Sequence, residues 1–132
     1  MIETVRIETP ADEAAMSTMR MGIGGVGARC DLSIDDLDDI YLAVGELLRV
    51  AGELEPLQRY VLELEISPQA LNLRAGPFHS PDLRACLSLE PSAISCLDLR
   101  QLLDGTLQSF AVHDKDGKFS VVMTKALTER TA

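Results

Sequence analysis

The chain of 132 residues has the length of one ordinary domain, and it is acidic, with 12 Lys and Arg against 21 Asp and Glu. The net charge of −9 disfavours unaided binding to nucleic acid or to an anionic membrane and favours basic protein surfaces as partners. Hydrophobic residues make up 46% of the chain but aromatic residues only 4%, so we expect one aliphatic core in a single domain over residues 1–132.

Neither a membrane segment nor a disulfide framework is indicated. No apolar run reaches the roughly 20 residues that span a bilayer, and the N-terminal residues lack the basic and apolar regions of a signal peptide. We therefore expect a cytoplasmic protein that does not bind membranes. The three cysteines, Cys30, Cys86 and Cys96, form neither an even set nor a CxxC pair, which predicts reduced thiols and no metal site.

The first 30 residues predict a strand followed by a helix. Thr4–Glu8 alternates polar and apolar residues, as a short strand does, and Pro10 ends it. A helix is predicted from Ala11 to about Val26, and the glycines at 22, 24, 25 and 27 are interpreted as its weakened C-terminus and a loop. A phosphate-binding loop is the alternative interpretation, but the glycines follow a helical pattern and no Lys-Ser or Lys-Thr pair comes after them.

The second helix has the clearest start. Ser33 and Asp36 form a Ser/Thr-x-x-Asp/Glu capping box, and apolar residues then recur with a helical period from Leu37 to Ala51. Five aspartates between residues 31 and 39 suit the positive end of the helix dipole. An EF-hand calcium loop beginning at residue 31 is the alternative, but it would need glycine and glutamate where the chain has Asp36 and Leu42.

The remaining residues predict two hairpins and a third helix. Residues 60–66 and 70–75 alternate as two antiparallel strands, whereas 77–91 contains three prolines and predicts an irregular, lid-like loop. A helix is predicted over 92–104, ended by Gly105, and a hairpin over 109–124 turns at Asp116-Gly117. The predicted fold is α+β, a two-layer sandwich of three helices on a mainly antiparallel sheet of four to five strands.

The helix at 36–51 resembles the N-box helix of the anti-sigma factor serine kinases, small bacterial members of the histidine-kinase-like ATPase superfamily. The family pattern there is close to D-D-x-x-L-A-V-x-E-x-x-x-N-A, and the string Ala43-Val44-Gly45-Glu46 carries most of the similarity. Pro10-Ala11 followed by Arg20 resembles the family's first helix, and residues 121–127 resemble its closing strand. The resemblance covers nearly the whole chain and implies the Bergerat-type fold of that superfamily.

The resemblance also implies roles for individual residues, with departures. In the family, the N-box Glu is a general base that activates a serine of the anti-anti-sigma partner, and the Asn four residues later binds the magnesium ion of ATP. The first position is Glu46, but the second holds Val50, which offers no oxygen to magnesium. The adenine-binding D-x-G box matches Arg74-Ala75-Gly76, and Arg74 has hydrogen-bond donors but no acceptor.

The lid motif departs as well. The family's G-x-G-L matches Ala93-Ile94-Ser95-Cys96, so both glycines have been replaced by residues that carry a Cβ. Gly76 and Ser95 remain the candidate nucleotide contacts, while Val50, Arg74 and Ala93 depart from the pattern. We expect no cofactor, and ATP with magnesium only if the chain is an active kinase.

These departures favour a regulatory binding module over an enzyme. The first hypothesis is a nucleotide-independent, anti-sigma-factor-like module that docks a sigma factor or an anti-anti-sigma protein to regulate transcription, without direct contact with nucleic acid. The resemblance assigns partner binding to Arg20 and implies a homodimer. The alternatives are an active serine kinase that transfers phosphate from ATP to an anti-anti-sigma protein, with Glu46 as the general base, and a purely structural dimerisation domain.

Overall fold

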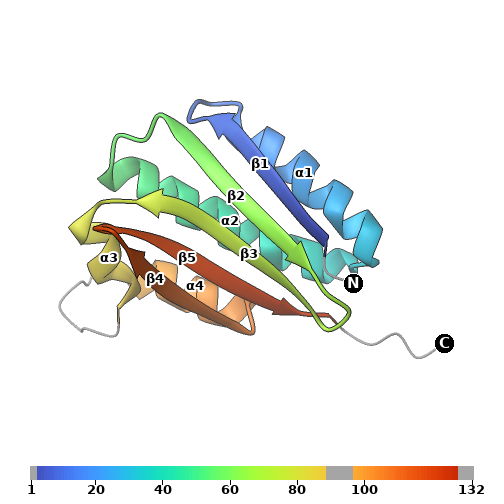
Figure 1. Cartoon of the computed structure of the whole chain (residues 1–132). Coiled ribbons are helices and arrows are strands. Elements are labelled where there is room, and N and C mark those ends of the chain that lie inside the picture. Colours follow the sequence, from blue (N-terminus) through green and yellow to red (C-terminus); the bar gives the residue numbers. More distant parts are fainter. Residues whose placement is uncertain (1–2, 89–96, 128–132) are drawn as a thin grey trace.

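The computed structural model describes residues 3–88 and 97–127, which form an α+β sandwich of two layers (Figure 1). The strands are β1 Glu3–Pro10, β2 Arg59–Ile66, β3 Ala70–Phe78, β4 Ser109–Lys115 and β5 Lys118–Ala126. The helices are α1 Ala15–Cys30, α2 Ile34–Leu54, α3 Pro81–Leu87 and α4 Leu97–Thr106. The predicted α+β class is confirmed, and the described residues contain one helix more than the three predicted. Among them, no helix is long and apolar enough to cross a bilayer.

The sheet has the strand order β1-β2-β3-β5-β4, and every neighbouring pair is antiparallel. The hairpin of β2 and β3 places Leu64 opposite Leu73, as the alternation predicts. The second predicted hairpin is also confirmed. Its turn residues, Asp116 and Gly117, have φ values of 54° and 77°, the left-handed conformation that a two-residue hairpin turn requires.

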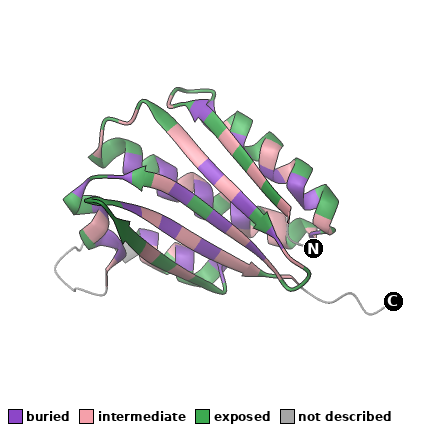
Figure 2. Ribbon diagram, in the orientation of Figure 1, coloured by how far each residue is buried: buried purple, intermediate pink, exposed green. Residues whose placement is uncertain are grey.

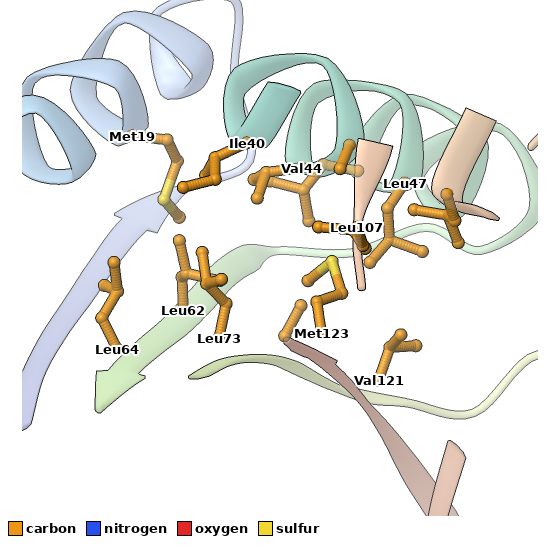
Figure 3. Close-up of a cluster of buried hydrophobic side chains, with 14 of the residues drawn as sticks. Met19, Ile40, Val44, Leu47, Leu62, Leu64, Leu73, Leu107, Val121 and Met123 are labelled. Carbon is orange, nitrogen blue, oxygen red and sulfur yellow. The ribbon is translucent and has the colours of Figure 1, made fainter. Parts of the chain in front are cut away.

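The core lies between the helices and one face of the sheet. Along β2, β3 and β5, buried residues alternate with more exposed ones (Figure 2). The buried side chains of the sheet meet those of α1 and α2, and Figure 3 shows this cluster of Met, Ile, Leu and Val residues. The core is thus mainly aliphatic, and full burial of each such side chain contributes about 1.5–3 kcal/mol. The other face of the sheet carries the polar residues.

The observed first helix, α1, differs from the predicted one at both ends. It starts later because the Asp12 carboxylate accepts a hydrogen bond from the Ala14 N–H at 3.0 Å in a turn before the helix. The glycine run lies inside α1 and forms neither the predicted loop nor the end of the helix. A Cβ at Gly22 would overlap Ile7 of β1, and one at Gly27 would lie 2.7 Å from Leu37 Cδ2, so these glycines allow close packing.

Ser33 is the N-cap of α2, as predicted. The Ser33 side chain accepts a hydrogen bond from the Asp36 N–H at 3.0 Å. The aspartates of this turn have an additional role, because Lys125 of β5 reaches them: its Nζ lies 2.8 Å from Asp39 Oδ2 and 3.8 Å from Asp36 Oδ1. The same ammonium donates to the carbonyl of Thr106 at the end of α4, at 2.8 Å. Lys125 therefore joins α2, α4 and the sheet.

The segment predicted to be an irregular loop, 77–91, contains a helix instead. Helix α3 has Ser80 as its N-cap, with the hydroxyl accepting from the Leu83 N–H at 3.2 Å, and Pro81 in its first turn. The Ser-Pro-Asp string at 80–82 is typical of a helix start, because proline is tolerated in the first turn. The three prolines of the segment, considered in the sequence alone, predict a loop instead. The structure also has Cys86 in a disulfide, so the prediction of reduced thiols is wrong at that position, while Cys30 is a free thiol.

The third predicted helix ends two residues later than expected. The described part of it, α4, ends at Thr106, so Gly105 is a helical residue and does not end the helix. The Thr106 hydroxyl donates to the Leu102 carbonyl at 2.7 Å, and Thr106 and Leu107 are both buried. Burial of these two residues holds the last turn in helical form beyond the glycine. Residues 92–96 of the predicted helix lie outside the described residues.

Candidate functional site

Glu46 lies on the surface of α2 in an ion pair. Its carboxylate accepts two hydrogen bonds from Arg49, one turn away, at 3.0 Å from Nε and 2.5 Å from a terminal nitrogen. These hydrogen bonds, together with the positive charge of Arg49, lower the pKa of Glu46 below its usual value of 4.5. Burial acts in the opposite direction and is outweighed. A carboxylate with a lowered pKa is a weaker general base. Glu46 is therefore held in a form poorly suited to accepting a proton from a serine.

Val50 is an aliphatic packing residue of α2. Its side chain is half-buried and packs against the hydrophobic core. Magnesium requires oxygen ligands in near-octahedral geometry, and Val50 supplies none. Among the described residues, no three or more His, Cys, Asp or Glu side chains are grouped to hold a metal ion. Position 50 thus supplies no oxygen ligand to a magnesium ion.

Arg74 lies on the polar face of the sheet, opposite to the helices. It is exposed, and its strand partners are Glu63 on β2 and Val122 on β5. With these residues it lines a shallow cavity of about 520 Å³ on that face. Arg74 and Glu46 therefore stand on opposite sides of the sheet, and the structure does not bring them into one site.

Gly76 ends the regular pairing of β3 with β5. Its φ is 140°, and an added Cβ would lie 3.0 Å from Ser120 Oγ and 3.1 Å from the Phe119 carbonyl oxygen. The close approach of β5 and the positive φ account for a glycine here without any ligand. Ser95 and Ala93, the other nucleotide-box positions, lie outside the described residues.

The end of α2 is tied to the start of α3 by Glu55. Its carboxylate accepts hydrogen bonds from the His79 N–H at 3.0 Å and the Ser80 N–H at 3.2 Å, and it contacts His79 Nδ1 at 2.9 Å. Burial is the largest single influence on the pKa of Glu55 and raises it, but the bonds from His79 and Ser80 together outweigh burial and lower the pKa. Beyond this clamp, Leu83 and Leu87 of α3 are buried in the core. Helix α3 is in contact with both α2 and α4.

Arg20 of α1 and Tyr41 of α2 are in contact where the two helices pack together. Arg20 of α1 places its guanidinium 5.5 Å from the centre of the Tyr41 ring, a cation–π contact, and the Tyr41 hydroxyl donates to the Arg20 carbonyl at 3.4 Å. Within the described part of the chain, Arg20 has no ion pair. Beside it, Met21 is 78% exposed, and beside Tyr41, Leu42 is 55% exposed. We call these four residues the α1–α2 surface.

Sequence reasoning singled out Arg20 but missed the other three residues of this surface. One signal was present: Met21 and Leu42 are apolar residues that lie outside the buried stripes of their helices, at positions where an amphipathic helix usually has polar side chains. Exposed large apolar residues that gather on one surface are typical of interaction sites.

No protein-family model matches the chain, and no curated protein matches it. The structure is similar to a crystal structure of the RsbU and RsbW domains of Rv1364c from Mycobacterium tuberculosis, with a TM-score of 0.66 over 95% of this chain and 14% sequence identity. The chain spans only 32% of the length of that protein. At this identity the similarity establishes the fold alone, which is RsbW-like.

Proposed function

We propose that this protein is a regulatory binding module that docks a sigma factor or an anti-anti-sigma protein through the α1–α2 surface, without using a nucleotide. The observation that carries the proposal is the state of Arg20: an exposed cation without an ion pair among the described residues, oriented by Tyr41 and flanked by exposed Met21. A partner carboxylate would pair with Arg20, and partner apolar residues would cover Met21. The RsbW-type fold supports the sigma-regulatory class.

The proposed independence from nucleotide follows from the three positions described above. Arg49 forms hydrogen bonds with the carboxylate of Glu46, and Val50 has no oxygen that could bind magnesium. Arg74 lies on the opposite face of the sheet from α2. A thermal-shift titration with magnesium-ATP is expected to give no saturable rise in melting temperature. A saturable rise that follows RT ln(1 + [L]/Kd) would favour the serine-kinase alternative. We further propose that the module acts in the cytoplasm as a homodimer, which sedimentation equilibrium tests.

The docking proposal is tested with charge-reversed variants. Purified sigma factors and anti-anti-sigma proteins of the source organism are titrated against the wild type, Arg20→Glu and Arg74→Glu. Arg74 is the matched control, because it is also exposed and has no ion pair within residues 3–88 and 97–127, but it lies on the opposite face. Arg20→Glu is expected to weaken binding by about tenfold or more, whereas Arg74→Glu leaves it unchanged. Failure of every such protein to bind the wild type would refute the proposal.

A further inference from the structure

The first half of α2 presents a second apolar feature that packing does not explain. Ile34, the first residue of α2, is 77% exposed, and Leu42 is 55% exposed. Eight residues separate them, so they stand about 12 Å apart along the helix axis on its outward side. No neighbouring element of the described chain covers either side chain. An isoleucine exposed to this degree gives nothing to the stability of the monomer.

The aspartates around these two residues divide into two groups with different roles. Asp36 and Asp39 face Lys125 and are used within the fold. Asp35 and Asp38 are exposed, and within residues 3–88 and 97–127 neither carboxylate has a hydrogen bond or an ion pair. Asp38 lies four residues from both Ile34 and Leu42, so these three side chains follow one another on neighbouring turns. The outward side of α2 thus alternates apolar contact points with unneutralised negative charge.

We propose that this outward side of α2, formed by Ile34, Asp35, Asp38 and Leu42, docks a basic amphipathic helix of the partner protein. This inference rests on the proposed function and names the chemistry of the partner segment. Two apolar side chains about two turns apart on the incoming helix cover Ile34 and Leu42, and flanking Lys or Arg residues pair with Asp35 and Asp38. The protein's net charge of −9 favours a basic segment over an acidic one.

The side is continuous with the α1–α2 surface, because Leu42 belongs to both. A helix lying along α2 from Ile34 would reach Leu42 next to Tyr41 and Arg20, where a carboxylate of the same partner could pair with Arg20. The partner segment is therefore expected to be basic at one end and to carry an acidic residue toward the other. This polarity fixes the direction in which it binds.

The test uses a synthetic peptide of about 18 residues, Ala-rich, with leucines at helical spacing on one side and lysines beside them. A second peptide has the same composition in scrambled order, and a third has glutamate in place of lysine. Binding to the full chain is measured by fluorescence anisotropy. The double variant Ile34→Ala/Leu42→Ala has Leu54→Ala as its control, a partly exposed leucine at the other end of α2. Asp35→Asn/Asp38→Asn has Asp104→Asn as its control, an exposed aspartate of α4.

The amphipathic lysine peptide is expected to bind the wild type about tenfold more tightly than either other peptide. Removing both apolar side chains should weaken binding about tenfold, and neutralising both aspartates about threefold, with both controls unchanged. Equal binding of the scrambled peptide, or no effect of the apolar double variant, would overturn the inference. The two proposals can be refuted separately. If a sigma regulator binds and its binding depends on Arg20 but not on Ile34 or Asp35, only this inference is refuted. If no sigma factor or anti-anti-sigma protein binds, the proposed function is refuted.

Discussion

Replacement of Gly25 with alanine should stabilise the protein. Gly25 is exposed within α1, and a Cβ added there meets no atom within 4 Å. In a helix interior, alanine is more favourable than glycine by about 0.8–1.0 kcal/mol, because glycine loses more backbone entropy on folding. Since nothing in the structure opposes the added methyl group, the free energy of unfolding should rise by about 1 kcal/mol.

The same substitution two residues later should not stabilise the protein. Gly27→Ala gains the same helix propensity, but the new Cβ would lie 2.7 Å from Leu37 Cδ2 and 3.4 Å from Leu32 Cδ1. Both leucines pack between α1 and the start of α2, and overpacking of this kind costs about 1–3 kcal/mol. The net change should therefore lie between zero and a loss of about 2 kcal/mol.

Urea unfolding followed by far-UV circular dichroism measures both changes, with the slope m checked for constancy so that the midpoints report stability. For a chain of this size, 1 kcal/mol corresponds to about 3–5 °C in melting temperature. If Gly25→Ala destabilised the protein, α1 would not run through the glycine run. If Gly27→Ala stabilised it as much as Gly25→Ala, α1 and α2 would not pack as closely as the structure has them.

Two further predictions concern charged side chains that join elements. Lys125→Met leaves Asp39 and Asp36 without their cation and the Thr106 carbonyl without its donor. The free energy of unfolding, measured in urea, should fall by about 2–3 kcal/mol. A fall below about 0.5 kcal/mol would show that the Lys125 ammonium is solvated instead. Glu55→Gln should cost about 1–3 kcal/mol at neutral pH. Because the folded pKa of Glu55 lies below its usual 4.5, the stability that its charge contributes is present above pH 4.5 and is lost as the pH falls through the folded pKa. The difference between wild type and Glu55→Gln should therefore shrink in acid, and a difference that is constant from pH 7 to pH 3 would contradict this reasoning.

Most of the fold follows from local sequence patterns. Alternation predicted the strands, and the capping box at Ser33 placed the start of α2 within one residue of the observed Ile34. The errors come from residues whose conformation is decided by packing. Helix α1 runs through its glycines, and Gly22 and Gly27 let β1 and α2 approach it closely. Gly105 is helical because Thr106 and Leu107 are buried beyond it. A single sequence does not reveal such contacts.

The candidate site was less predictable than the fold. The family resemblance directed attention to Arg20 and Glu46, but the ion pair of Glu46 with Arg49 and the position of Arg74 on the opposite face depend on geometry. The exposure of Ile34 and Leu42 also required the structure, because an apolar residue near a helix start is buried more often than not. The aspartates at the start of α2 are the clearest example. In the sequence they form one group of five, whereas in the fold some face Lys125 and others face outward.

The strand order has a consequence for how the chain folds during synthesis. β1 pairs with β2, so Glu3 stands opposite Ile66, and α1 and α2 lie between them in the sequence. Hairpins such as β2–β3 close short loops and form early, whereas pairing across so many residues is slow. During synthesis, β1 leaves the ribosome before β2, which is made only after both helices. Until residues 59–66 have left the ribosome, Val5 and Ile7 lack the strand beside which they lie in the fold, and an unpaired apolar strand is open to aggregation and to chaperone binding.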